Sequence, residues 1–158
     1  MRSLALMLAR LCATAWVGAA ALFVVVGVLE VTAPNFTSET KDQLAVLRFP
    51  AYYLCGAVLI GVALLSSAAA IGHGQLPRWR GWVATGLLAA ALATLGADYI
   101  LVYKPLERLI TPPGKPRTSE FIALHRWSSR VNSVQVGLCA VSAVLLCAPS
   151  RRPRDAGG

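Results

Sequence analysis

The chain has little charge for its length. Asp, Glu, Lys and Arg together make up 14% of its 158 residues, whereas a soluble domain carries about 25%. The charged residues also lie mostly outside four long apolar blocks. This distribution excludes an ordinary water-soluble domain, and the segments between the blocks are too short to hold one.

The residues that usually build metal, haem or disulfide sites are scarce as well. His73 and His125 are expected at opposite membrane faces, which disfavours bis-histidine haem, and His125 with scattered carboxylates is a weak metal-ligand set. The four cysteines all lie within apolar blocks and have no paired spacing, so we expect no disulfide framework: Cys12, Cys55, Cys139 and Cys147. The sequence therefore predicts no metal and no bound cofactor.

The apolar residues form four blocks, each close to the roughly 20 residues that span a bilayer: Leu11–Leu29, Phe49–Ile71, Trp82–Val102 and Val131–Ala148. The first block is longer than the apolar region of about 7–15 residues in a secretory signal, so it is predicted to be a span. Backbone groups in lipid must be hydrogen-bonded within the segment, which favours helices. We therefore predict an all-α integral membrane protein, an antiparallel four-helix transmembrane bundle. It forms a single domain over residues 1–158, with helices at about 4–30, 49–72, 81–103 and 119–148 and a short basic tail at 149–158.

The net charge of +8 comes from basic residues at the ends of the apolar blocks and in the tail. Lipid head groups attract basic residues at such positions. Membrane lipids and other membrane-protein subunits are therefore the expected partners, and nucleic acid is not. Four spans place both termini on one side, with seven basic residues there and eight on the other side. The positive-inside rule decides little from these numbers, but the basic tails and second loop favour cytoplasmic termini. The alanine- and arginine-rich residue usage is compatible with a bacterium, so we expect a bacterial inner-membrane protein.

Two further patterns concern packing. Pairs of small residues four positions apart let membrane helices approach closely, and three such pairs are Ala57/Gly61, Gly86/Ala90 and Ser133/Gly137. Aromatic residues gather near the two expected interfaces, where they are typical membrane anchors. At one interface these are Tyr52, Tyr53, Tyr99, Tyr103 and Trp127.

The up-and-down topology brings four helix ends to one membrane face, and these ends carry charge. The expected charge cluster comprises Glu30, Arg48, Asp98, Arg126 and Arg130. The last helix, with Thr118 or Ser119 as its expected N-cap, adds polar residues at and beside one face, given about 100° per residue. They are His125, Ser128, Ser129, Asn132 and Gln135, with Cys139 further along. A polar face at this depth must look into the bundle or into a wet cavity.

Two interpretations of this polar face remain open. In the first it is a structural clasp, in which Arg126 and Arg130 pair with Glu30 and Asp98 while Asn132 bonds across helices. Such polar contacts stabilise membrane bundles by about 0.6 kcal/mol each. In the second it is a vestibule for an ion, a metal or a small solute, which is the default hypothesis for ionisable groups at membrane depth.

The segment "FIALHRWSSRVNSV" resembles the motif that opens the last helix of the transmembrane protein 205-like family, a domain of unknown function. "LRFPAYYLCG" resembles the opening of that family's second helix, and "AWVGAAALF" its tryptophan–glycine first helix. The resemblance implies a polytopic membrane protein with no established biochemical activity, and no catalytic residue. The motif falls on Phe49, Pro50, Tyr52, Phe121, His125, Ser128, Ser129 and Asn132. Some relatives carry copper-resistance names, but the two methionines of this chain give little support to a sulfur-lined metal path.

These observations favour a non-enzymatic membrane protein. It is expected to be a structural or assembly component, or a factor for tolerance of small solutes or metals. The alternative is a membrane oxidoreductase subunit that binds haem or quinone.

Overall fold

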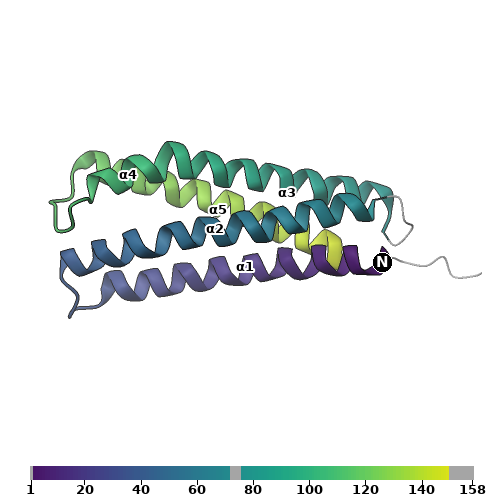
Figure 1. Cartoon of the computed structure of the whole chain (residues 1–158), viewed down its shortest axis with the longest axis horizontal. Helices are drawn as coiled ribbons and strands as arrows, with labels where there is room; N and C mark the ends of the chain where they lie inside the picture. Colours follow the sequence, from purple (N-terminus) through teal and green to yellow (C-terminus); the bar gives the residue numbers. More distant parts are fainter. Residues whose placement is uncertain (1, 72–75, 150–158) are drawn as a thin grey trace, which may run out of the picture.

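The structure, a computed structural model, describes residues 2–71 and 76–149 of the chain. Its helices are α1 (Arg2–Thr32), α2 (Ser38–Ala70), α3 (Arg78–Asp98), α4 (Lys104–Leu109) and α5 (Ser119–Cys147). A π-helical turn, η1 (Tyr99–Tyr103), joins α3 to α4, so that α3, η1 and α4 form one continuous rod (Figure 1). His73 and the tail beyond residue 149 lie outside the described residues.

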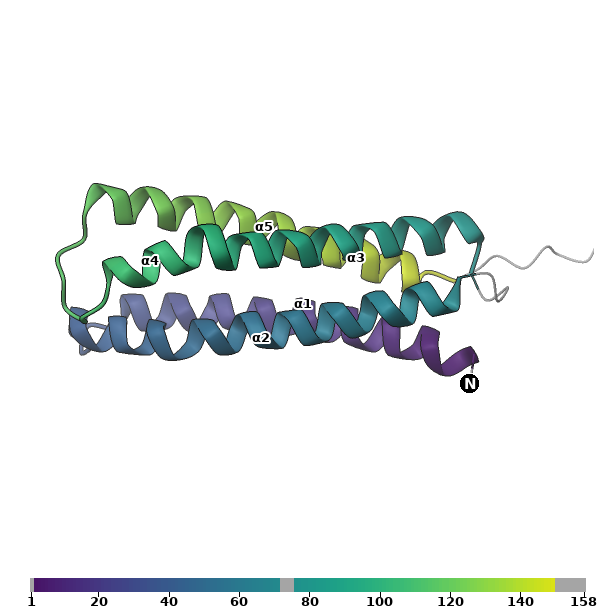
Figure 2. The same cartoon turned by 45° about the horizontal axis from the view of Figure 1, so that its top comes forward.

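The helices pack antiparallel in two layers. Helix α1 lies beside α2, and the α3–α4 rod lies beside α5; each layer contacts the other through α2 with α3 and α1 with α5 (Figure 2). The α1–α2 and α4–α5 connections lie at one end of the bundle, called the loop end here. The amino-terminal end of α1 and the carboxyl end of α5 lie at the opposite end of the bundle, called the terminal end here (Figure 1).

The outer surface of the bundle is apolar. Each of the four long helices contains an apolar window of spanning length, and only 17–28% of that window is buried inside the protein. Large apolar side chains such as Leu22, Leu54, Leu65 and Val144 are more than 60% exposed. An exposed apolar surface of this extent suits a lipid environment. The predicted fold class is thereby confirmed: all-α, with four long antiparallel helices that can each cross a membrane.

Two helices are longer than predicted. Helix α2 begins at Ser38 rather than near residue 49, because Thr37 caps it by accepting a hydrogen bond from the Thr40 amide (3.2 Å). Pro50 then lies inside the helix. The third rod continues to Leu109 through the π-turn. At about 1.5 Å per residue the rods are roughly 45–50 Å long, which exceeds the ~30 Å hydrocarbon core, so they extend beyond the hydrocarbon.

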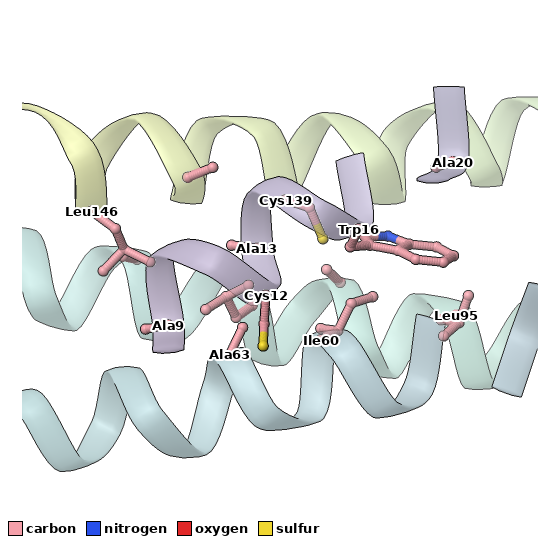
Figure 3. Close-up of a cluster of buried hydrophobic side chains, with 14 of the residues drawn as sticks. Ala9, Cys12, Ala13, Trp16, Ala20, Ile60, Ala63, Leu95, Cys139 and Leu146 are labelled. Carbon is pink, nitrogen blue, oxygen red and sulfur yellow. The ribbon is translucent and has the colours of Figure 1, made fainter. Parts of the chain in front are cut away.

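The centre of the bundle is built around Trp16, which is fully buried (Figure 3). Its indole lies against Gly56 of α2, where an added Cβ atom would be 2.7 Å from the ring. The three predicted small-residue pairs do not mark helix contacts. An added Cβ at Gly61, Gly86 or Gly137 would meet no atom within 4 Å, since these positions are only partly buried or face outward.

We expect Gly56→Ala to destabilise the bundle, because the new methyl group would overlap the Trp16 ring in a packed interior. Overpacking of this kind costs about 1–3 kcal/mol. Gly61→Ala, one and a half turns further along α2, has open space and serves as the matched control. Thermal unfolding in a mild detergent measures both; equal melting temperatures for the two variants would contradict the packing described.

Candidate functional site

Three helices meet at the carboxylate of Asp98, the last residue of α3. Asp98 is 5% exposed, and its Oδ2 atom accepts a hydrogen bond from the Tyr53 hydroxyl of α2 at 2.6 Å. The Ser128 hydroxyl of α5 donates to the same oxygen at 3.2 Å. A single carboxylate oxygen therefore joins α2, α3 and α5.

The other carboxylate oxygen of Asp98 has no hydrogen-bond partner in the part of the chain that the structure describes. Among the described residues no group donates a hydrogen bond to Oδ1, and no Lys, Arg or His nitrogen lies within 4.0 Å of the carboxylate. Burying an uncompensated charge is costly, so this arrangement is unusual for a group whose only task is to hold helices together.

A second layer of polar contacts lies beside Asp98. The Tyr52 hydroxyl of α2 donates to Asn132 Oδ1 of α5 at 2.6 Å, across the bundle. One turn further along α5, Gln135 is buried and its Nε2 approaches Cys139 Sγ at 3.8 Å. Gln135 Oε1 and Trp16 Nε1 are buried without partners in the described part of the chain. The interior between the middle of the bundle and Asp98 thus contains polar atoms whose bonding capacity is only partly used.

The expected charge clasp has different partners in the structure. Glu30 pairs with Arg48, which joins α1 to α2, and within the described residues no salt bridge links Glu30 to Arg126 or Arg130. Both of these arginines are exposed and make no salt bridge within the described residues. The reason is that the buried residues of α5 begin only at Gln135. The amino-terminal half of α5 packs on η1 and α4, which leaves the arginine stripe outside the bundle.

The polar face of α5 accordingly has an exposed part and a half-buried part. His125 and Ser129 are exposed, and the His125 ring stacks on Phe121 with centroids 5.9 Å apart. Ser128 and Asn132 are half-buried and bond to the other helices. Of the two predicted N-cap candidates, Thr118 and Ser119, the structure has Thr118, since its side chain accepts from the Phe121 amide at 3.1 Å.

An aromatic cluster adjoins Asp98. The π-turn places Tyr99 and Tyr103 next to Tyr53, with ring centroids 5.0–5.5 Å apart in the three pairs. The Lys104 ammonium lies over the Tyr99 ring at 5.3 Å and over the Tyr103 ring at 5.8 Å. It also pairs with Glu107 at 3.0 Å. Three of the tyrosines that the sequence suggested as membrane anchors therefore pack on one another, and one of them, Tyr53, bonds to the carboxylate.

A groove runs along the outside of the bundle beside this cluster. Its volume is about 290 Å³, and it is lined by residues of α2 and α3: Pro50, Tyr53, Leu54, Ala57, Leu92, Leu95, Gly96 and Tyr99. The groove is apolar along most of its length. The Tyr53 and Tyr99 side chains bring it close to Asp98.

Sequence reasoning missed a second buried acid, Asp42, because the polar segment around it resembled a loop. Asp42 is fully buried in the first turns of α2 and pairs with Arg117. It also accepts from the Gly114 amide at 3.0 Å. These contacts fasten the α4–α5 connection onto α2, and Figure 2 shows that connection reaching across to the start of α2.

Two arginines at the terminal end have a structural role rather than the lipid-anchoring role that the sequence suggested. Arg80 is buried and donates to the carbonyls of Leu145 (3.0 Å from Nε) and Ala148 (2.6 Å). Arg10 donates to the Leu146 carbonyl at 2.8 Å. Cations that bond the last carbonyls of a helix also complement its dipole. The carboxyl end of α5 is therefore held by α1 and α3.

No group of three or more His, Cys, Asp or Glu side chains in residues 2–71 and 76–149 is arranged to hold a metal ion. No protein family, no curated protein and no solved structure matches the chain. The family resemblance of the last helix therefore stays a prediction.

The diagonal bond between Tyr52 and Asn132 gives a test of the site. Replacing Asn132 with Leu leaves the Tyr52 hydroxyl buried without an acceptor, which costs about 1–3 kcal/mol. Adding Tyr52→Phe removes that unpaired hydroxyl, so the double variant should lose less stability than the two single variants summed. Unfolding in mild detergent, followed by circular dichroism, measures the four proteins of the cycle. If the stability losses of the two single variants add up to that of the double variant, the hydrogen bond between Tyr52 and Asn132 does not form.

Proposed function

We propose that this chain is a non-enzymatic integral membrane protein that binds a small solute at the Asp98–Tyr53 centre, in the class of solute-tolerance factors. We also propose that it lies in a bacterial inner membrane with cytoplasmic termini. Its relation to the transmembrane protein 205-like family belongs to the same proposal.

The observation that carries the proposal is the bare carboxylate oxygen of Asp98. A structural carboxylate in a membrane bundle is expected to have a basic partner or a full set of donors. Asp98 has two hydroxyl donors on one oxygen and none on the other within the described residues. The remaining acceptor capacity is available to a solute that donates a hydrogen bond or carries positive charge.

The other functions considered have less support. A metal site needs ligands that converge, and the described residues contain no such group. His125, the one histidine among them, is exposed and stacked on Phe121. A purely structural role would be consistent with the hydroxyl bonds of Asp98 but leaves its second oxygen unexplained.

The variant Asp98→Asn tests the proposal. The amide oxygen can still accept from Tyr53 and Ser128, so the fold should persist, whereas the charge and the bare carboxylate oxygen are lost. Native mass spectrometry of protein purified in mild detergent should detect a small molecule bound to the wild type and at least tenfold less on Asp98→Asn.

Glu120→Gln is the matched control, because Glu120 is exposed near the same membrane face and makes no described ion pair. It should retain the bound molecule. If the wild type and Asp98→Asn carry the same species in equal amounts, Asp98 has a structural role and the proposal fails.

A further inference from the structure

We infer that the groove between α2 and α3 binds a lipid-soluble organic cation, an amine or quaternary ammonium with an apolar body, that enters from the bilayer. The inference rests on the proposed function, because it assigns a chemical class to the solute of the Asp98 centre.

The shape of the groove favours a small apolar body. The groove opens to the outer surface at three small or compact exposed residues, Pro50, Ala57 and Gly96. Gly96 has no atom within 4 Å of the position of an added Cβ. The volume of about 290 Å³ lies near the lower limit of small-molecule sites, which is about 300 Å³. A molecule in this groove would have one side on protein and the other on lipid.

The charge at one end of the groove favours a cation. Tyr53 lines the groove and its hydroxyl donates to Asp98, so the carboxylate is one hydrogen bond away from a lining residue. A negative charge in a medium of low dielectric constant attracts a cation and repels an anion strongly. Tyr53 and Tyr99 also line the groove, and aromatic rings attract ammonium groups by cation–π interaction.

The protein already holds one ammonium group on these rings. Lys104 Nζ lies over Tyr99 and Tyr103 at 5.3 and 5.8 Å, which is within the cation–π range of about 6 Å. Its charge is compensated by Glu107 at 3.0 Å. Lys104 therefore indicates that the tyrosine cluster attracts ammonium groups. Because Glu107 pairs with Lys104, the lysine repels a second cation less strongly.

A comparison within the molecule supports the choice of groove. A second groove lies between α1 and α2 and is lined by Trp16, Phe23, Tyr52 and Arg48, among others. There a cation of the chain itself, Arg48, lies over the Phe23 ring at 4.7 Å. The second groove therefore has a guanidinium group within its own lining, whereas the residues that line the α2–α3 groove carry no charge.

The test uses radiolabelled benzyltrimethylammonium and the protein in dodecyl maltoside, with equilibrium dialysis as the measurement. Neopentylbenzene has the same shape but carries carbon in place of the charged nitrogen, so it serves as the neutral competitor. Gly96→Leu fills the groove from α3. Gly86→Leu makes the same change on the same helix outside the groove, also with no atom within 4 Å of the new Cβ.

We expect saturable binding to the wild type, weakened at least about tenfold by Asp98→Asn and by Gly96→Leu. Gly86→Leu and Glu120→Gln should bind as the wild type does, and neopentylbenzene should not compete. Melting curves of all variants establish that each protein is folded, and Gly86→Leu shows whether a leucine on α3 is tolerated.

Three outcomes would overturn the inference: no saturable binding to the wild type, equal binding to the wild type and Asp98→Asn, or equal competition by neopentylbenzene. The native mass spectra separate this failure from that of the proposed function. An Asp98-dependent adduct without ammonium binding means that the centre takes a solute of another class. If the mass spectra show no Asp98-dependent adduct and the ammonium does not bind either, Asp98 has a structural role.

Discussion

A carboxylate placed inside an apolar bundle has to be compensated by the protein around it, and the arrangement of the loop end follows from how Asp98 meets this requirement. Its Oδ2 oxygen takes the hydroxyls of Tyr53 and Ser128, so α2, α3 and α5 converge on one atom. Hydroxyl donors bring no positive charge, whereas an arginine partner would. The contacts that join the helices therefore leave a carboxyl group without a cationic partner among the described residues, beside a cluster of tyrosines.

The other polar contacts hold the bundle on either side of this centre. At the terminal end, Arg10 and Arg80 bind the last carbonyls of α5. Beyond Asp98, at the loop end, Asp42 fastens the α4–α5 connection to α2. Between them Trp16 fits against Gly56. With both ends secured, the lipid-facing groove between α2 and α3 lies on a fixed framework, which suits a binding surface.

The sequence predicted those parts of the structure that depend on the average composition of long segments or on local chemistry. Four apolar blocks fixed the number of helices and their antiparallel order, and Thr118 marked the start of α5 because its capping chemistry is local. Asp98 was singled out because the up-and-down topology brings the charged helix ends to one membrane face. The extension of α2 back to Ser38 was missed, since its polar first turns have no apolar period and Pro50 suggested a helix start.

Side-chain partners were predicted less well, for a physical reason. Opposite charges at one membrane face suggested that Arg126 and Arg130 meet Glu30 and Asp98, but the choice depends on the rotation and crossing of α5, which sequence does not reveal. Arg48 on the neighbouring helix reaches Glu30 instead. Tyr53 was regarded as an interfacial anchor because tyrosines near a membrane face usually are. The π-turn, which brings Tyr99 and Tyr103 to the same cluster, has no recognised sequence signal here.

The most direct test of this account is the thermal unfolding, in dodecyl maltoside, of the double variant Arg126→Gln/Arg130→Gln. If hydroxyl groups alone compensate Asp98, both arginines are surface residues, and changes at such positions alter stability by about 0.5 kcal/mol or less. The melting temperature should then stay within about 2 °C of the wild type. Breaking a buried ion pair costs about 3–5 kcal/mol. A fall of roughly 6 °C or more would show that an arginine compensates Asp98 and would contradict the account.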